Sequence, residues 1–209
     1  MTLRIASLLL LTVCCLALVV APAMADTLYS NGPYNGTVDA WTINFGFSVS
    51  DAARVGNELE NATGFSMVDW NVPGFVTTGA EIQLGASSFG NNYADLTLAP
   101  SGSTDLGSNQ FGYELWQYDF TFAPVAVPQG TIWVTLSNAT DSGGNPVYWD
   151  ENSGPSTAYE NSVGSIASEA FTITGTYNEV ETTPEPSSIM LFGSGILGLA
   201  GVLRRKLNV

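Results

Sequence analysis

The sequence predicts an all-β protein, a β-sandwich with the jelly roll as one candidate topology. Three observations carry this prediction. Apolar residues alternate with small or polar residues over several short segments, which is typical of strands that bury one face. Turn-forming segments rich in Gly, Asn, Ser and Thr separate them. No long segment has the 3.6-residue period of an amphipathic helix, so roughly seven to nine strands are expected.

Three segments show the alternation most clearly, namely residues 41–49, 131–137 and 171–177. In the first, the odd positions are apolar and the even positions are small or polar. Each segment is expected to form a strand with one buried face. The inward side chains expected in the second and third are Ile132, Val134 and Leu136, followed by Phe171, Ile173 and Tyr177.

Weaker patterns complete the predicted sandwich. Further strands are expected over residues 64–70, 75–84, 93–98 and 111–122. The segments 101–103 and 141–145 are rich in Gly and Ser and are expected to be turns. Residues 51–60 could make a short helical turn.

Charge is distributed unevenly along the 209 residues, whose formal net charge is −14. Residues 26–183 contain 18 acidic residues and a single basic residue, Arg54, so this stretch has a net charge of −17. A chain this acidic repels phosphate groups, which excludes nucleic acid as a partner. Its density of aromatic residues argues against disorder.

The same stretch lacks the residues that most catalytic sites use. Residues 26–183 contain no His, Lys or Cys, because both cysteines, Cys14 and Cys15, lie near the N-terminus. This excludes Ser-His-Asp and Cys-His catalysis, Lys Schiff bases and thiolate or imidazole metal sites. Paired carboxylates could still hydrolyse a glycosidic bond, and carboxylates and carbonyls could still bind Ca²⁺.

The first 25 residues are typical of a secretory signal peptide. Arg4 supplies the positive charge, and residues 5–20 are almost entirely apolar. Ala23 and Ala25 provide the small residues that signal peptidase requires, so cleavage is expected before Asp26. A retained membrane anchor is the alternative, although the apolar run is short for crossing a bilayer.

The other end has three parts in a fixed order: a Pro-Glu-Pro tripeptide, an apolar and Gly-rich segment over residues 189–203, and a basic cluster. The tripeptide is Pro184, Glu185 and Pro186, and the cluster is Arg204, Arg205 and Lys206. As a helix the apolar segment would be roughly 22 Å long, shorter than the hydrocarbon layer of about 30 Å. We therefore expect a short transmembrane helix whose basic end stays in the cytoplasm.

Four regions follow from these patterns. They are a signal peptide at 1–25, a β-sandwich domain at 26–180, a linker with the Pro-Glu-Pro tripeptide at 181–188, and an apolar helix with a basic tail at 189–209. Both ends predict the same topology, with the domain outside the inner membrane.

The tail resembles the PEP-CTERM protein-sorting signal of exported bacterial proteins. That resemblance implies recognition and removal by exosortase, a membrane enzyme similar to a transpeptidase. A plain anchor without processing is the alternative. The middle of the chain is similar to the globular part of a group of PEP-CTERM proteins with no established enzymatic role, and the segments that carry this looser resemblance are 38–44, 131–140 and 146–152.

Three places in the middle of the chain offer chemistry. Glu114 shares a strand face with four aromatic residues and could act as a catalytic acid, whereas Asp119 faces the other side. The loop 141–145 combines oxygen ligands with glycines and could bind Ca²⁺. In the segment 148–152, Tyr148 and Trp149 could stack on a sugar. For each, a structural role in a strand or turn is the favoured interpretation.

The function expected from the sequence is that of an exported protein of the cell surface or extracellular matrix with a structural or adhesive role. It is not expected to be an enzyme, and no catalytic residue, metal site or cofactor is assigned. The expected partners are an exosortase-like enzyme, signal peptidase and, as a candidate, exopolysaccharide. A Ca²⁺- or carbohydrate-binding module is the first alternative, and an exported glycosidase is the second.

Overall fold

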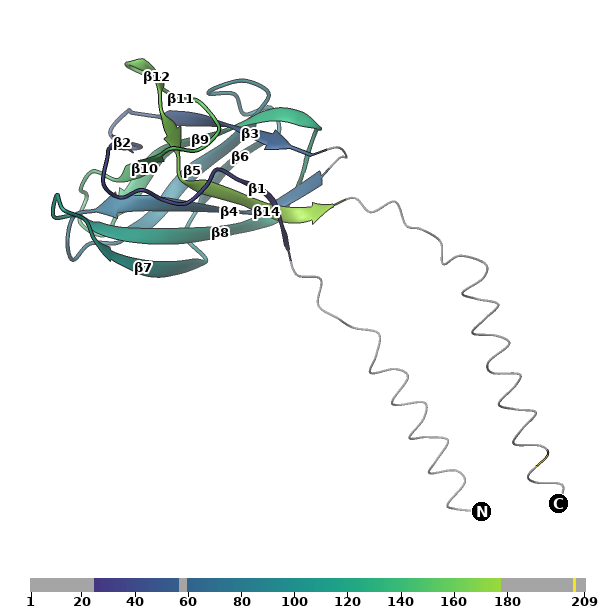
Figure 1. Cartoon of the computed structure of the whole chain (residues 1–209), viewed down its shortest axis with the longest axis horizontal. Helices are drawn as coiled ribbons and strands as arrows, with labels where there is room; N and C mark the ends of the chain where they lie inside the picture. Colours follow the sequence, from purple (N-terminus) through teal and green to yellow (C-terminus); the bar gives the residue numbers. More distant parts are fainter. Residues whose placement is uncertain (1–24, 57–59, 178–204, 206–209) are drawn as a thin grey trace. The chain divides into compact units, whose positions relative to one another are not determined.

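Two antiparallel sheets stacked face to face make up the fold of this computed structural model (Figure 1). The structure describes residues 25–56, 60–177 and Arg205. The chain divides into two units, Met1–Tyr177 and Asn178–Val209, and only Arg205 of the second unit is described. The signal peptide and the C-terminal helix expected from the sequence lie outside the described residues. The predicted domain boundaries stay predictions.

The larger sheet has eight strands, with β4 at its centre. Strand β8 pairs with β4 along its whole length and carries β7 on its other side. On its opposite side, β4 pairs with β14 over residues 60–67 and with β10 at residues 69–70. Strand β14 in turn pairs with β1. Strands β2 and β13 both pair with β10. The bounds are β1 Asp26–Ser30, β2 Ala40–Thr42, β4 Glu60–Asn71, β7 Gly102–Ser108, β8 Glu114–Val127, β10 Tyr148–Asn152, β13 Ser168–Glu169 and β14 Phe171–Tyr177.

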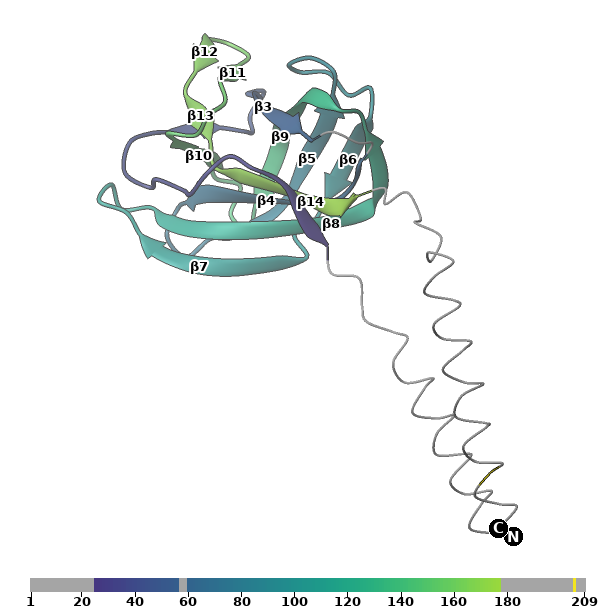
Figure 2. The ribbon, with the colours of Figure 1, turned by 45° about the vertical axis from the view of Figure 1, so that its right-hand side comes forward.

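The smaller sheet has six strands in the order β12-β11-β3-β9-β5-β6. All of its neighbours are antiparallel. Its bounds are β3 Val49–Val55, β5 Thr77–Gly85, β6 Ala94–Leu98, β9 Gly130–Asp141, β11 Ala158–Glu160 and β12 Gly164–Ile166. Figure 2 shows β3, β9, β5 and β6 as one layer, with β4, β14 and β8 in the other. The predicted sandwich is confirmed, and the jelly-roll topology stays a prediction.

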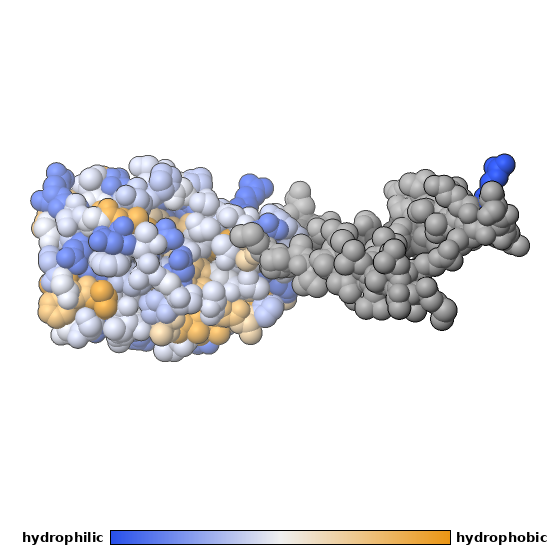
Figure 3. Space-filling view, turned by 90° about the horizontal axis from the view of Figure 1, so that it is seen from below, coloured by the Kyte–Doolittle hydropathy of each residue, from blue (hydrophilic) through white to orange (hydrophobic). Residues whose placement is uncertain are grey.

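The core lies between the sheets and is built from alternate residues of each strand. Ile132, Val134 and Leu136 of β9 are fully buried, as the alternation of that segment predicts. They face an aromatic group from the larger sheet, in which Phe65 contacts Trp149 edge-on with ring centroids 6.1 Å apart. Phe120 and Phe171 join this group. Figure 3 shows one outer face, which is hydrophilic or neutral over most of its area with separate apolar patches.

Two predicted segments are wrong in part. Residues 41–49 do not form one strand: β2 ends at Thr42, and Phe45 adopts a left-handed φ of 56° with its ring exposed. The apolar alternation therefore continues through a turn, which Gly46 helps to form with a φ of 90°. Residues 51–55, the first part of the segment 51–60 that could make a helical turn, belong to β3 instead and pair with β9, whereas residues 57–59 lie outside the described residues.

Smaller differences concern strand ends. Gly102 and Ser103, expected in a turn, begin β7 instead. Tyr177 is 47% exposed rather than inward, and it is the last residue of β14. The expected strands over 64–70, 75–84, 93–98 and 111–122 correspond to β4, β5, β6 and β8.

Candidate functional site

The structure describes three of the residues assigned to processing and sorting. Ala25 is exposed and directly precedes β1, which begins at Asp26. Arg205 is exposed. The other six, Ala23, Pro184, Glu185, Pro186, Arg204 and Lys206, lie outside the described residues. Within the part of the chain that is described, no helix is long and apolar enough to cross a membrane.

Glu114 and Asp119 each accept hydrogen bonds from separate neighbouring groups. Glu114 stands at the start of β8 and its Oε2 accepts a hydrogen bond from the amide of Gly74 at 3.2 Å. Asp119 accepts hydrogen bonds from Ser66 Oγ at 2.6 Å and from Gln117 Nε2 at 3.0 Å. Each carboxylate thus has a local structural role on its strand.

The loop 141–145 is a turn closed by its own first residue. Asp141 accepts hydrogen bonds from the amides of Gly143 and Asn145 and from the Asn145 side chain. Burial raises the pKa of Asp141, but these hydrogen bonds outweigh it and lower the pKa overall. Among the described residues no group of three acids, histidines or cysteines is arranged to hold a metal ion.

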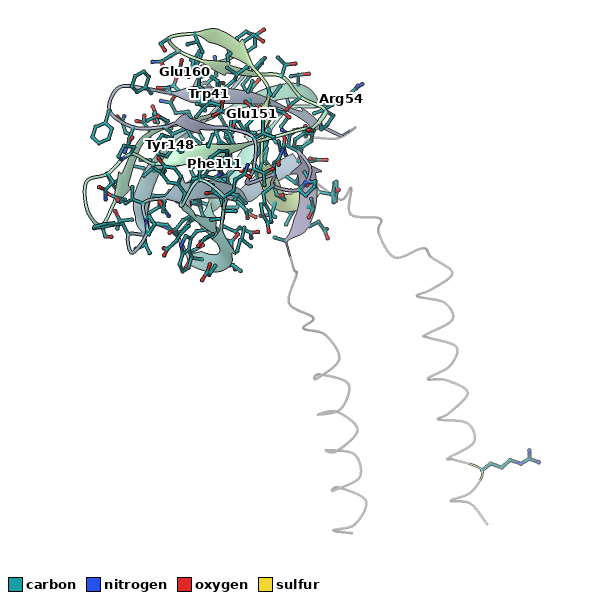
Figure 4. All side chains as sticks on the ribbon, turned by 60° about the vertical axis from the view of Figure 1, so that its left-hand side comes forward. Trp41, Arg54, Phe111, Tyr148, Glu151 and Glu160 are labelled. Carbon is teal, nitrogen blue, oxygen red and sulfur yellow. The ribbon has the colours of Figure 1, made fainter. Side chains whose placement is uncertain are left out.

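The segment 148–152 forms β10, and its polar side chains form hydrogen bonds with neighbouring loops and strands. Trp149 is fully buried, so it cannot stack on a sugar. Asp150 is also fully buried and accepts hydrogen bonds from the amides of Asn35 and Gly36 and from Trp70 Nε1. Tyr148 contacts Tyr113 edge-on. Glu151 accepts a hydrogen bond from Trp41 Nε1, and Figure 4 shows these two residues and Tyr148 in one region.

Sequence reasoning missed a network of buried acids where β3 meets the end of β10 and β13. Asp51 is fully buried, and its Oδ2 accepts hydrogen bonds from Asn31 Nδ2 at 3.0 Å and from the Glu169 amide at 2.7 Å. Asn31 Nδ2 also lies 2.7 Å from Ser156 Oγ. Glu169 is fully buried too, and neither of its carboxylate oxygens has a hydrogen-bond partner among the residues that the structure describes.

Burial and mutual repulsion change the acidity of this network. Burial raises the pKa of Asp51 to about 6, although hydrogen bonds from Ser156, the Glu169 amide and Asn31 oppose it. The pKa of Glu169 lies well above its usual value, first because of burial and then because of negative charges, of which that of Asp51 is the largest. Protonated Glu169 is therefore favoured in the fold, since a charged carboxylate without partners is costly to bury.

One signal in the sequence could have revealed Asp51. It occupies a position of the apolar alternation of β3, between the fully buried Val49 and Ala53. An acid in an apolar row must be either paired or protonated. No such signal exists for Glu169, because β13 is only two residues long.

In a comparison with models of protein families, the PEP-CTERM protein-sorting motif matches residues 182–206. No match was found among curated proteins or among solved structures. The matched residues include the Pro-Glu-Pro tripeptide, the apolar segment and the basic cluster. The resemblance inferred from the order of these three parts is thereby confirmed: residues 182–206 of this chain are a PEP-CTERM protein-sorting motif.

Proposed function

We propose that this protein is exported, held for a time in the inner membrane by its tail, processed by exosortase, and then displayed at the cell surface or in the extracellular matrix. The observation that carries this proposal is the PEP-CTERM motif at residues 182–206. It follows a β-sandwich whose last strand ends at Tyr177. The sandwich is then the cargo, and the tail is its sorting signal.

Each part of the tail positions one short peptide for a membrane enzyme. Pro184 and Pro186 favour an extended backbone and stop a helix from growing backward into the domain. The apolar segment keeps the peptide at the outer surface of the inner membrane. The basic cluster resists crossing and fixes the depth of the segment. Glu185 lies between the two prolines, where exosortase would recognise its side chain.

The position of β1 supports cleavage by signal peptidase before Asp26. Strand β1 begins at Asp26, which is paired with Gly175 of β14. Cleavage there removes everything before the strand and leaves all of its residues in the domain. The small residues Ala23 and Ala25 stand where the peptidase requires them.

A structural or adhesive role fits the sandwich better than catalysis. Residues 26–183 lack His, Lys and Cys. The acids considered as catalytic, Glu114 and Asp119, bond to neighbouring backbone and side-chain groups. Asp51 and Asp150 likewise hold loops together from inside the fold. Exopolysaccharide is the proposed partner in the matrix.

The test compares the mass and the membrane fraction of the protein in cells with and without exosortase. Glu185→Ala should leave membrane insertion intact but reduce processing. Replacing Arg204, Arg205 and Lys206 by Gln should weaken membrane retention. Glu181→Ala is the matched control, because it removes an acid just before the motif and should be processed normally. If all variants and the cells without exosortase yield the mature mass of the wild type, the tail is only an anchor and the sorting proposal fails.

A further inference from the structure

A groove of about 570 Å³ crosses the outer face of the smaller sheet, over β11, β3 and β9. Arg54 and Trp133 line it from the outer face of their strands, because Ile132 points inward and is fully buried. Ala53 of β3, which is fully buried, also lines the groove. The volume lies within the range of about 300–1,000 Å³ that small-molecule sites occupy. Tyr29 of β1 and residues 155–157 complete the lining.

Two aromatic side chains, Trp133 and Tyr159, contact each other across β3. Trp133 of β9 is paired directly with Ala52 of β3, and Tyr159 of β11 is paired with Ser50 on the other side of β3. The rings of Trp133 and Tyr159 lie with centroids 5.6 Å apart and tilted by 56°. Tyr159 is 37% exposed. Aromatic rings of this kind bind the C–H faces of sugar rings by burying apolar surface.

The charge of the groove is opposite to that of the domain around it. Arg54, the only basic residue among residues 26–183, lines the groove beside its cross-strand neighbour Thr131. None of the lining residues is acidic, although this stretch of chain contains 18 acids. The structure gives the exposed Arg54 no ion pair or hydrogen bond with any described residue. Figure 4 shows Arg54 at the margin of the domain, apart from Trp41, Tyr148 and Glu151.

The wall formed by Tyr29 and Ser156 is fixed from behind by the buried network. Tyr29 Oη donates a hydrogen bond to Asn31 Oδ1 at 2.7 Å. Asn31 Nδ2 in turn binds Ser156 Oγ and Asp51 Oδ2. The groove is therefore preformed, which reduces the entropy that a ligand must lose on binding.

We infer that this groove binds a saccharide chain that carries carboxylate groups, that is, a polysaccharide containing uronic acid. Sugar rings pack against Trp133 and Tyr159, and the guanidinium of Arg54 binds one carboxylate. Two parallel N–H···O hydrogen bonds match the planar carboxylate group. The inference does not depend on how the tail is processed.

The chemistry of the groove favours this ligand over other anions. A single guanidinium can neutralise only one charge, while the remaining acids repel a densely charged polymer such as a nucleic acid. A saccharide in which neutral rings separate the uronates offers one carboxylate to Arg54 and has a low enough charge density to avoid strong repulsion by the acids. A neutral saccharide would use the aromatic rings but leave Arg54 without an anion.

The test measures binding to the full chain, kept in a polyoxyethylene detergent that contains no sugar. The probes are an acidic trimer with one galacturonic acid between two galactose residues, and its neutral counterpart, a trimer of galactose. Calorimetry and tryptophan fluorescence report binding, and a chelator prevents metal ions from bridging carboxylates. The acidic trimer should bind at least about tenfold more tightly than the neutral one, as expected for a hydrogen bond between charged groups.

Four variants separate the two halves of the site. Arg54→Gln should abolish the preference for the acidic trimer, a loss of about tenfold or more. Arg54→Lys should keep part of it, because Lys retains the charge without the planar pair of donors. Tyr159→Ala should weaken both trimers by about tenfold through lost stacking. Tyr177→Ala is the matched control, since it removes another exposed tyrosine, 47% against 37%, from the larger sheet and should bind like the wild type.

Three results would overturn the inference. They are equal binding of the two trimers, binding of the acidic trimer that Arg54→Gln leaves unchanged, and no binding of either trimer at millimolar concentration. Arg54 is exposed and has no partner among the described residues, so its variants should fold normally, and circular dichroism checks this. Loss of binding would leave the exosortase-dependent change in mass untouched, which distinguishes the two proposals.

Discussion

Stability should increase when the solution is acidified, because the folded protein holds a proton on Asp51 more tightly than the unfolded chain does. The usual pKa of an aspartate is 3.8, and burial raises that of Asp51 to about 6. The free energy of unfolding therefore falls as pH rises through this interval. Above about pH 6 the stabilising contribution of protonated Asp51 is lost. At about 1.4 kcal/mol per pKa unit, the change is about 3 kcal/mol.

The variant Asp51→Asn isolates this contribution. It cannot ionise, so its free energy of unfolding should fall by about 2 kcal/mol less than that of the wild type between pH 4 and pH 7, which spans most of the full change. Removing the negative charge also relieves Glu169, whose pKa Asp51 raises, and this effect has the same sign. Glu151, Asp150 and Asp39 act on Glu169 in both proteins.

The assay is urea unfolding of the full chain in mild detergent, followed by tryptophan fluorescence at several pH values. Asp105→Asn is the control, because it makes the same chemical change on the exposed face of β7 and should give a profile parallel to that of the wild type. If Asp51→Asn also runs parallel to the wild type, the pKa of Asp51 is not raised in the fold and the reasoning fails.

Three further outcomes are expected. Trp149→Ala should lower the free energy of unfolding by about 3–5 kcal/mol, because it removes a fully buried ring that contacts Phe65 and Phe171; an unchanged urea midpoint would contradict this. Phe45→Asn should raise stability by up to about 1 kcal/mol, because Asn tolerates the left-handed backbone better, and Phe47→Asn serves as its control in thermal unfolding. A reducing agent should leave the melting temperature of the protein without its signal peptide unchanged, since no cysteine follows Cys15; a lower value would reveal a constraint that the sequence does not contain.

The strands were predictable where burial alone decides the pattern. Residues 131–137 alternate because β9 lies inside the smaller sheet with one face on the core, and its inward set was identified correctly. The same rule failed at residues 41–49, where alternation persists through a turn and Phe45 points outward. It failed again at β3, where two charged residues interrupt the apolar pattern. Asp51 is buried on the face that points to the core, and Arg54 is exposed on the other face.

The buried network and the groove were not predictable, because their parts come from distant places in the chain. Asn31 and Asp51 are 20 residues apart, and Asp51 and Glu169 are 118 apart. The two rings of the groove, Trp133 and Tyr159, meet across β3 only once the strand order of the smaller sheet is known. The sorting motif was predictable because its three parts are contiguous in the sequence.

The pairing of β14 has a mechanical consequence for a protein held by its tail. The strand that leads to the tail is hydrogen-bonded on both sides, to β1 over residues 172–175 and to β4 along its whole length. A pull applied beyond Tyr177 therefore enters an interior strand rather than an edge. Two rows of hydrogen bonds share that load, so the domain resists being peeled from its attachment more strongly than if an edge strand had led to the tail.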